Sequence, residues 1–251
     1  MSTINQLLRN TPQLWRGRQH NRSQRSLPTG YARLDRQLPG HGWPQGALTE
    51  LMTLKPGMGE LRLLFPALAE ISQRGQWVIL VDPPWIPYPA ALHGHGLLLD
   101  HLLVVRTGNG KKTLWACEQA LHSGRGGAVL AWPEQISFSR LRRLQIAAES
   151  SAKLDFLFRP ASASKESSPA ALRLQLGADH HRGIRINILK CRGSRPAEPV
   201  WIPQLFSAYG KQPRHTQTHA SYTEHTISTT LAGHSFSATV AGPAQPRAKQ
   251  H

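Results

Sequence analysis

The chain has 251 residues, with 30 lysines and arginines against 14 aspartates and glutamates, a formal net charge of +16. This length fits one α/β domain with flanking arms and argues against a second full domain. The charge favours an acidic or polyanionic partner, and the alternative is a basic protein with basic tails and no nucleic-acid role. No apolar run approaches the roughly 18 residues that span a bilayer, so we expect no membrane contact.

The two cysteines, Cys117 and Cys191, are far apart in the sequence and form no Cys-x-x-Cys pair. Residues 1–26 are too polar for a secretory signal peptide. Both observations indicate thiols in a reducing compartment and predict a cytoplasmic protein.

Residues 1–26 are predicted to be an N-terminal arm with one short helix that ends before Pro12. Trp15 and Arg16 follow this helix in a polar, arginine-rich stretch. A helix this short is unstable alone in water, so it docks on its own domain or a neighbour, or else the arm is a frayed tail.

The stretch Gly46 to Leu64 predicts a buried strand, a glycine turn and a helix, the layout of a phosphate-binding loop. With Gly59 as the second glycine of that motif, Glu60 stands where the phosphate-binding lysine belongs and Leu61 where the magnesium-binding hydroxyl belongs. A carboxylate repels phosphate. The stretch, with Gly57 and Gly59 kept for the turn, therefore indicates a degenerate loop that binds no nucleotide cofactor.

Apolar strands and amphipathic helices alternate along the middle of the chain, which predicts a mostly parallel central sheet flanked by helices. The expected strands are 47–54, 76–82, 102–106, 127–132 and 154–158, and the expected helices are 60–74, 90–98, 113–122 and 138–150.

A different pattern follows. Residues 159–168 are a serine-rich loop, 170–176 and 183–191 predict paired antiparallel strands, and 200–202 predict an edge strand. Residues 207–251 contain few large apolar side chains and are expected to be a disordered tail.

The segment Leu27 to Glu50 is similar to the lead-in of the RecA phosphate loop, so residues 27–206 are expected to form a RecA-like domain. Several further motifs, taken in order, resemble the ImuA proteins, RecA-like accessory factors of SOS-induced mutagenic translesion synthesis. The cell-division inhibitor SulA is a related branch. These motifs are Trp15–Gly17, Pro56–Pro66, Ala131–Pro133, Leu141–Glu149 and Phe158–Leu174.

The resemblance also implies that the chain is not an enzyme. Pro84 stands where RecA has the carboxylate that activates water, and Trp132 stands in place of the Walker B aspartate. Because phosphoryl transfer depends on electrostatic stabilisation, the loss of these groups together with the lysine and hydroxyl should abolish it.

The resemblance implies a non-catalytic adaptor of translesion synthesis. Its expected partners are an ImuB-type, Y-family polymerase-like protein, an error-prone replicative-type polymerase and RecA, with DNA as a further candidate. The alternative is a SulA-like inhibitor of cell division that binds FtsZ, and a third possibility is a DNA-binding protein that acts alone.

Several basic residues and tryptophans in the predicted arm, loops and helix faces are candidates for partner or DNA contacts. Lys190 and Arg192 match the place where RecA offers two lysines across its subunit interface, although an ordinary basic strand end fits as well. Histidine pairs at His93/His95 and His180/His181 lack neighbouring cysteines or carboxylates, so no metal site is expected. The contact candidates are Trp15, Arg16, Arg140, Arg143, Arg159, Lys190 and Arg192, with Arg142 and Arg173 as further members of a basic surface and Trp43 and Trp85 as further interface anchors. The alternative for the arginines is an ordinary solvated helix face.

Overall fold

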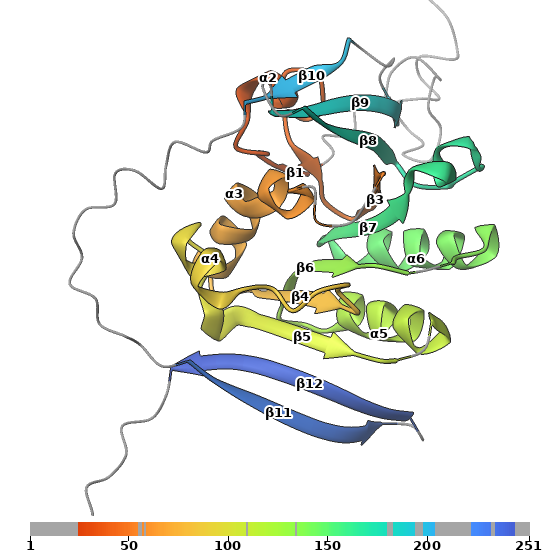
Figure 1. The fold of residues 1–251 in the computed structure, drawn as a ribbon. Helices are drawn as coiled ribbons and strands as arrows, with labels where there is room; N and C mark the ends of the chain where they lie inside the picture. Colours follow the sequence, from red (N-terminus) through yellow and green to blue (C-terminus); the bar gives the residue numbers. More distant parts are fainter. Residues whose placement is uncertain are drawn as a thin grey trace, which may run out of the picture.

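The computed structural model describes residues 25–54, 57, 59–108, 110–133, 135–179, 183–193, 198–203, 222–231 and 234–243. These residues form a mixed α/β fold in which helices cover both faces of one large sheet (Figure 1). The predicted helix of the N-terminal arm, together with Trp15 and Arg16, lies outside the described residues.

The centre of the sheet is parallel, as the alternation of strands and helices predicts. The strands run in the spatial order β8, β3, β7, β6, β4, β5, and each neighbouring pair is parallel. All their carboxyl ends therefore meet at one edge of the sheet. The bounds are β3 (Ala47–Thr53), β4 (Trp77–Val81), β5 (Leu102–Arg106), β6 (Gly126–Ala131), β7 (Leu154–Pro160) and β8 (Leu172–Asp179).

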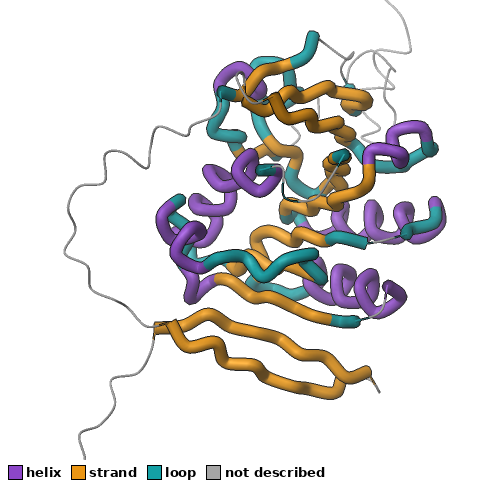
Figure 2. Tube along the Cα trace, viewed as in Figure 1, coloured by secondary structure: helices purple, strands orange, loops and turns teal. Residues whose placement is uncertain are grey.

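Two layers of helices enclose this sheet (Figure 2). Helices α3 (Glu60–Gln73) and α4 (Pro89–Gly94) cover one face, and α5 (Gly110–His122) and α6 (Phe138–Ser151) cover the other. Strand β4 is apolar throughout because both of its faces are buried. Val78 and Leu80 belong to the core beneath α3, whereas Ile79 and Val81 belong to the core beneath α5 and α6.

The predicted helix at 90–98 is shorter in the structure. Helix α4 ends at Gly94, Gly96 adopts a positive φ of 86°, and a short 3₁₀ helix, η1 (Leu99–His101), leads into β5. Glycine favours such a left-handed turn because it carries no Cβ, and this ends the helix early.

The segment before β3 is packed onto helix α3. It contains β1 (Ser26–Leu27), α2 (Ala32–Asp35) and β2 (Trp43–Pro44), and β1 pairs with β2. The predicted boundary between arm and domain at residue 26 thus falls within β1.

Pro66 lies inside α3 and cannot donate to the carbonyl of Arg62, four residues earlier. The Tyr31 hydroxyl donates to that carbonyl at 3.0 Å and satisfies it. Gly30, at φ 85°, lies so close that an added Cβ would be 2.4 Å from the Pro66 Cβ. The lead-in segment therefore stabilises the helix where the proline interrupts its hydrogen bonds.

Antiparallel strands extend the sheet beyond β8. Strand β9 (Gly183–Cys191) pairs with β8, and β10 (Val200–Ile202) forms the edge beside β9, as predicted. The serine-rich segment between β7 and β8 contains a 3₁₀ helix, η2 (Ala161–Lys165).

The opposite edge differs from the predicted disordered tail. Within residues 207–251 the structure describes a hairpin of β11 (Tyr222–Leu231) and β12 (His234–Pro243), and β12 pairs antiparallel with β5 (Figure 1). The segment is rich in threonine, and β-branched residues favour strands even where few large apolar side chains are present. The described helices include none that is long and apolar enough to cross a bilayer.

Candidate interaction site at the carboxyl edge of the sheet

The turn between β3 and α3 is closed by its own carboxylate. The backbone N–H of Gly57 donates to Oε1 of Glu60 at 2.8 Å, and Gly59 precedes the helix with φ 90°. Glu60 is the first residue of α3 and is only 6% exposed. Its negative charge is favoured by the helix dipole, and it takes a backbone donor of the kind that a bound phosphate would use.

Asp82, directly after β4, also faces inward. Its carboxylate accepts hydrogen bonds from the backbone N–H of Thr107 at 2.7 Å and from the hydroxyls of Thr107 and Thr113. The aspartate therefore ties together the ends of β4 and β5 and the first turns of α5. Two residues later Pro84 lies at the edge of a pocket.

The pocket has a volume of about 370 Å³ and lies between the ends of β3, β7, β6 and β4. Trp132, directly after β6, stacks on Phe158 with ring centroids 4.4 Å apart and planes 4° from parallel. The lining is mainly apolar, which suits an inserted apolar side chain better than a phosphate. It consists of Thr53, Leu54, Glu60, Pro84, Trp132, Pro133, Phe158, Arg159 and Pro160.

The sequence predicted that Arg159 contacts a partner or DNA at an exposed basic surface, but its side chain is almost entirely buried in the wall of this pocket. Its guanidinium is 5% exposed and pairs with Glu50 at 3.1 Å and with Glu166 at 2.7 Å. Arg173 pairs with the same, fully buried Glu50 at 2.6 Å. Both arginines therefore connect β3 to its two neighbouring strands from within the domain.

The remaining basic candidates do not form one surface. Arg143 on α6 pairs with Glu118 of α5 at 2.7 Å, and Arg192 lies 3.5 Å from Glu149. Lys190 donates to the carbonyl of Ser168 at 2.8 Å, and burial, reinforced by Arg173, lowers the pKa of its ammonium group.

Because β9 runs antiparallel to β8, Lys190 and Arg192 lie near the amino ends of the parallel strands, away from the Glu60 turn. Arg140 lies in the first turn of α6, and Arg142 is exposed further along that helix. The residues of the predicted basic surface at one end of the sheet therefore lie apart from one another in the fold.

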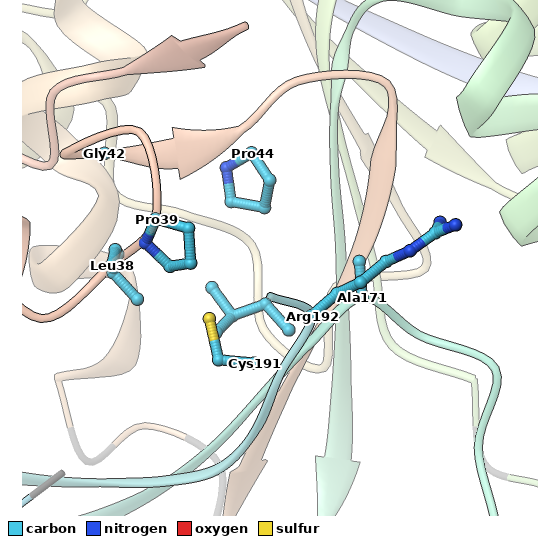
Figure 3. Close-up of a pocket in the computed structure, with 8 residues that line it drawn as sticks. Leu38, Pro39, Gly42, Pro44, Ala171, Cys191 and Arg192 are labelled. Atoms are coloured by element: carbon cyan, nitrogen blue, oxygen red, sulfur yellow. The ribbon is translucent and has the colours of Figure 1, made fainter. Parts of the chain in front are cut away.

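A second pocket, between the Leu38–Pro44 loop and the end of β9, is too small for an organic ligand (Figure 3). Its volume of about 10 Å³ is close to that of a single water molecule. Burial raises the pKa of the Cys191 thiol in its wall to about 11, so this thiol stays protonated and unreactive at neutral pH. In the part of the chain that the structure describes, no three potential metal ligands come together.

The predicted tryptophan anchors differ in their environments. Trp43 is fully buried and packs edge-on against Phe156 with centroids 5.3 Å apart, so it belongs to the core. Trp85, in contrast, is 69% exposed. Sequence reasoning missed Leu54, Ile86 and Tyr88, which are also apolar and exposed, because apolar residues in short loops carry no periodic signal.

Residues 46–154 match the family model described as "Cell division inhibitor SulA". A curated relative of that name from Photorhabdus laumondii is 34% identical over 115 residues, which are 46% of this chain and 65% of the relative. Relatives of the same name from Yersinia pestis (strain Pestoides F) and Yersinia pseudotuberculosis (strain IP 31758) are 27% identical over 115 residues and are covered over 68% of their length. The chain thus spans about two thirds of the curated relatives it matches.

These relatives correct the predicted function. The leading prediction, an ImuA-type adaptor of translesion synthesis, was wrong, because the matched proteins are named as inhibitors of cell division. The partners expected of that adaptor were an ImuB-type protein, RecA and an error-prone polymerase. The matched relatives do not support them. The findings favour the alternative, a SulA-like protein.

Proposed function

We propose that this chain is a SulA-like inhibitor of cell division that acts in the SOS response by binding the division protein FtsZ in the cytoplasm. The observation that carries this proposal is the SulA-family match over residues 46–154. That segment runs from β3 through α6 and contains the loops that follow β3, β4, β5 and β6. It therefore includes most of the carboxyl edge of the sheet, where α/β proteins commonly bind their ligands.

Inhibition without catalysis is consistent with the chemistry of this edge. Glu60 occupies the turn where a nucleotide phosphate would bind, and the Asp82 carboxylate is held by Thr107 and Thr113. Trp132 is stacked on Phe158 and supplies no carboxylate for magnesium. We therefore infer that the chain acts by binding and not by turnover.

The same edge supports a RecA-like origin for the fold. Strand β3, a turn with Gly57 and Gly59 at positive φ, and helix α3 follow one another as in a phosphate-binding loop. We infer a RecA-like scaffold on which a protein-binding surface has replaced the nucleotide site. We infer a domain over about residues 27–206, whose sheet the β11–β12 hairpin extends.

Assembly of purified FtsZ provides the test. With GTP present, an equimolar amount of the full chain should reduce the polymer that sediments, and its expression in growing cells should produce filaments. Heat-denatured chain at the same concentration serves as the control. Unchanged FtsZ assembly at tenfold excess, together with normal division of the expressing cells, would contradict the proposal.

A further inference from the structure

Four large apolar side chains are exposed on two loops at the carboxyl edge of the sheet. Leu54 follows β3, and Trp85, Ile86 and Tyr88 lie between β4 and α4. Their exposed fractions are 72%, 69%, 68% and 70%. We call these four residues the apolar rim. Such clusters on a soluble protein usually mark an interaction site, because their exposure to water is unfavourable.

The two loops of the apolar rim approach each other although β3 and β4 are not neighbours in the sheet. The indole nitrogen of Trp85 lies 3.7 Å from the position that a Cβ on Gly57 would occupy. Leu54 and Pro84 both line the 370 Å³ pocket with the Trp132–Phe158 stack at its wall. The rim and the pocket thus form one continuous surface, with an apolar border and an apolar cavity.

Two cations lie beside this surface, and the two nearby carboxylates, Glu60 and Asp82, are buried or half-buried. The guanidinium of Arg106 donates to the carbonyl of Pro83 at 2.6 Å, and Arg62 lies beside Gly59, so both cations border the rim. The carboxylate of Asp82 accepts hydrogen bonds from Thr107 and Thr113. Glu60 accepts from Gly57 through Oε1, and its buried Oε2 has no hydrogen-bond partner among the described residues. A partner that matches this surface carries an apolar side chain flanked by aspartate or glutamate.

We propose that the apolar rim and its pocket are the docking surface for FtsZ, which inserts an apolar side chain from an acidic segment into the pocket that Leu54 lines. This inference rests on the proposed function and assigns its partner a place on the molecule. Trp and Tyr are frequent binding hot spots because they combine a large apolar area with few rotatable bonds. Trp85 and Tyr88 should therefore contribute most of the affinity.

The test compares the affinity of full-length variants for FtsZ with that of the unaltered chain. Trp85→Ala and Tyr88→Ala should each weaken binding by about tenfold or more. Because both side chains are about 70% exposed, the variants should unfold at the same temperature as the unaltered chain. Ile146→Ala, which removes a 54% exposed apolar side chain from α6, serves as the matched control and should change the affinity less than about twofold.

The outcomes separate the surface from the function. If the unaltered chain binds FtsZ and the Trp85 and Tyr88 variants bind equally well, the surface is wrong and the function stands. If those variants lose only self-association in sedimentation, the rim joins two copies of this chain and the inference is also overturned. If the unaltered chain does not bind FtsZ, the proposed function and the proposed docking surface are both contradicted.

Discussion

Asp155 lies in the middle of β7 and is only 1% exposed, and neither of its carboxyl oxygens has a hydrogen-bond partner in the described part of the chain. Burial raises the pKa of this carboxyl group from 3.8 to about 8. The side chain is therefore neutral in the folded protein at pH 7 and ionised in the unfolded chain. Burial, with a contribution from Asp155, also raises the pKa of the Cys117 thiol well above its usual value.

This raised pKa predicts that stability falls as the pH rises. The folded protein holds a proton that the unfolded chain releases above about pH 4. The free energy of unfolding should therefore decrease by up to about 1.4 kcal/mol per pH unit from pH 4 towards pH 8 and then level off. Urea unfolding of Asp155→Asn should show a flatter dependence across this range, whereas Asp100→Asn, at an exposed position, should keep the original slope. An unchanged slope in Asp155→Asn would refute the assignment.

At the scale of single elements, the charged cluster around Glu50 links three strands. Glu50 in β3 accepts from Arg159 in β7 and Arg173 in β8. Arg173 also donates to the carbonyls of Ala163 and Glu166, which holds η2 against the sheet. The cluster therefore orients neighbouring elements, and its charges are satisfied only as a set.

Removal of the central carboxylate should be strongly destabilising. Glu50→Gln leaves two buried guanidinium groups without their shared anion, and we expect a loss of about 3–5 kcal/mol in the free energy of unfolding by urea denaturation. Glu70→Gln is the matched control, since it breaks a partly exposed pair with Arg74 in α3. That change should be below about 1 kcal/mol. Equal losses in the two variants would contradict the structural role of Glu50.

Several elements were predictable from the sequence because their signals are local. The apolar run of β4 and the helical spacing in α6 depend only on residues within one element, and both agree with the structure closely. The Glu50 cluster was not predictable. Its arginines are 109 and 123 residues away in the sequence, and only the pairing of β3 with β7 and β8 brings them together.

At the scale of the whole molecule, the C-terminal hairpin covers one edge of the sheet. Strand β12 pairs with Leu103 to Arg106 of β5 and leaves β11 at the outside. The two hydrophobic cores consist of described side chains between Leu27 and Ile202. The hairpin therefore extends the sheet and protects the backbone groups of β5 that pair with it.

A chain that ends at Pro203 keeps the two cores formed by the described side chains and should lose protection at this edge. We expect amide hydrogen exchange within β5 to accelerate by about tenfold or more, because part of its backbone hydrogen bonding is lost. Amides of β3, between β7 and β8, serve as the internal reference and should exchange at the original rate. Unaltered exchange in β5 would show that the hairpin does not protect this strand in solution.

The sequence by itself determined the alternation of strands and helices, the parallel centre with its antiparallel extension to β10, and the place of Glu60 in the turn after β3. These features depend on local periodicity, glycine positions and the identity of single residues. Only the tertiary structure decided which charges are exposed. It buries Arg159 against Glu50, places Lys190 and Arg192 far from the Glu60 turn, and brings Trp85 beside Gly57. Chain topology decides these proximities, since each joins segments that no local pattern connects.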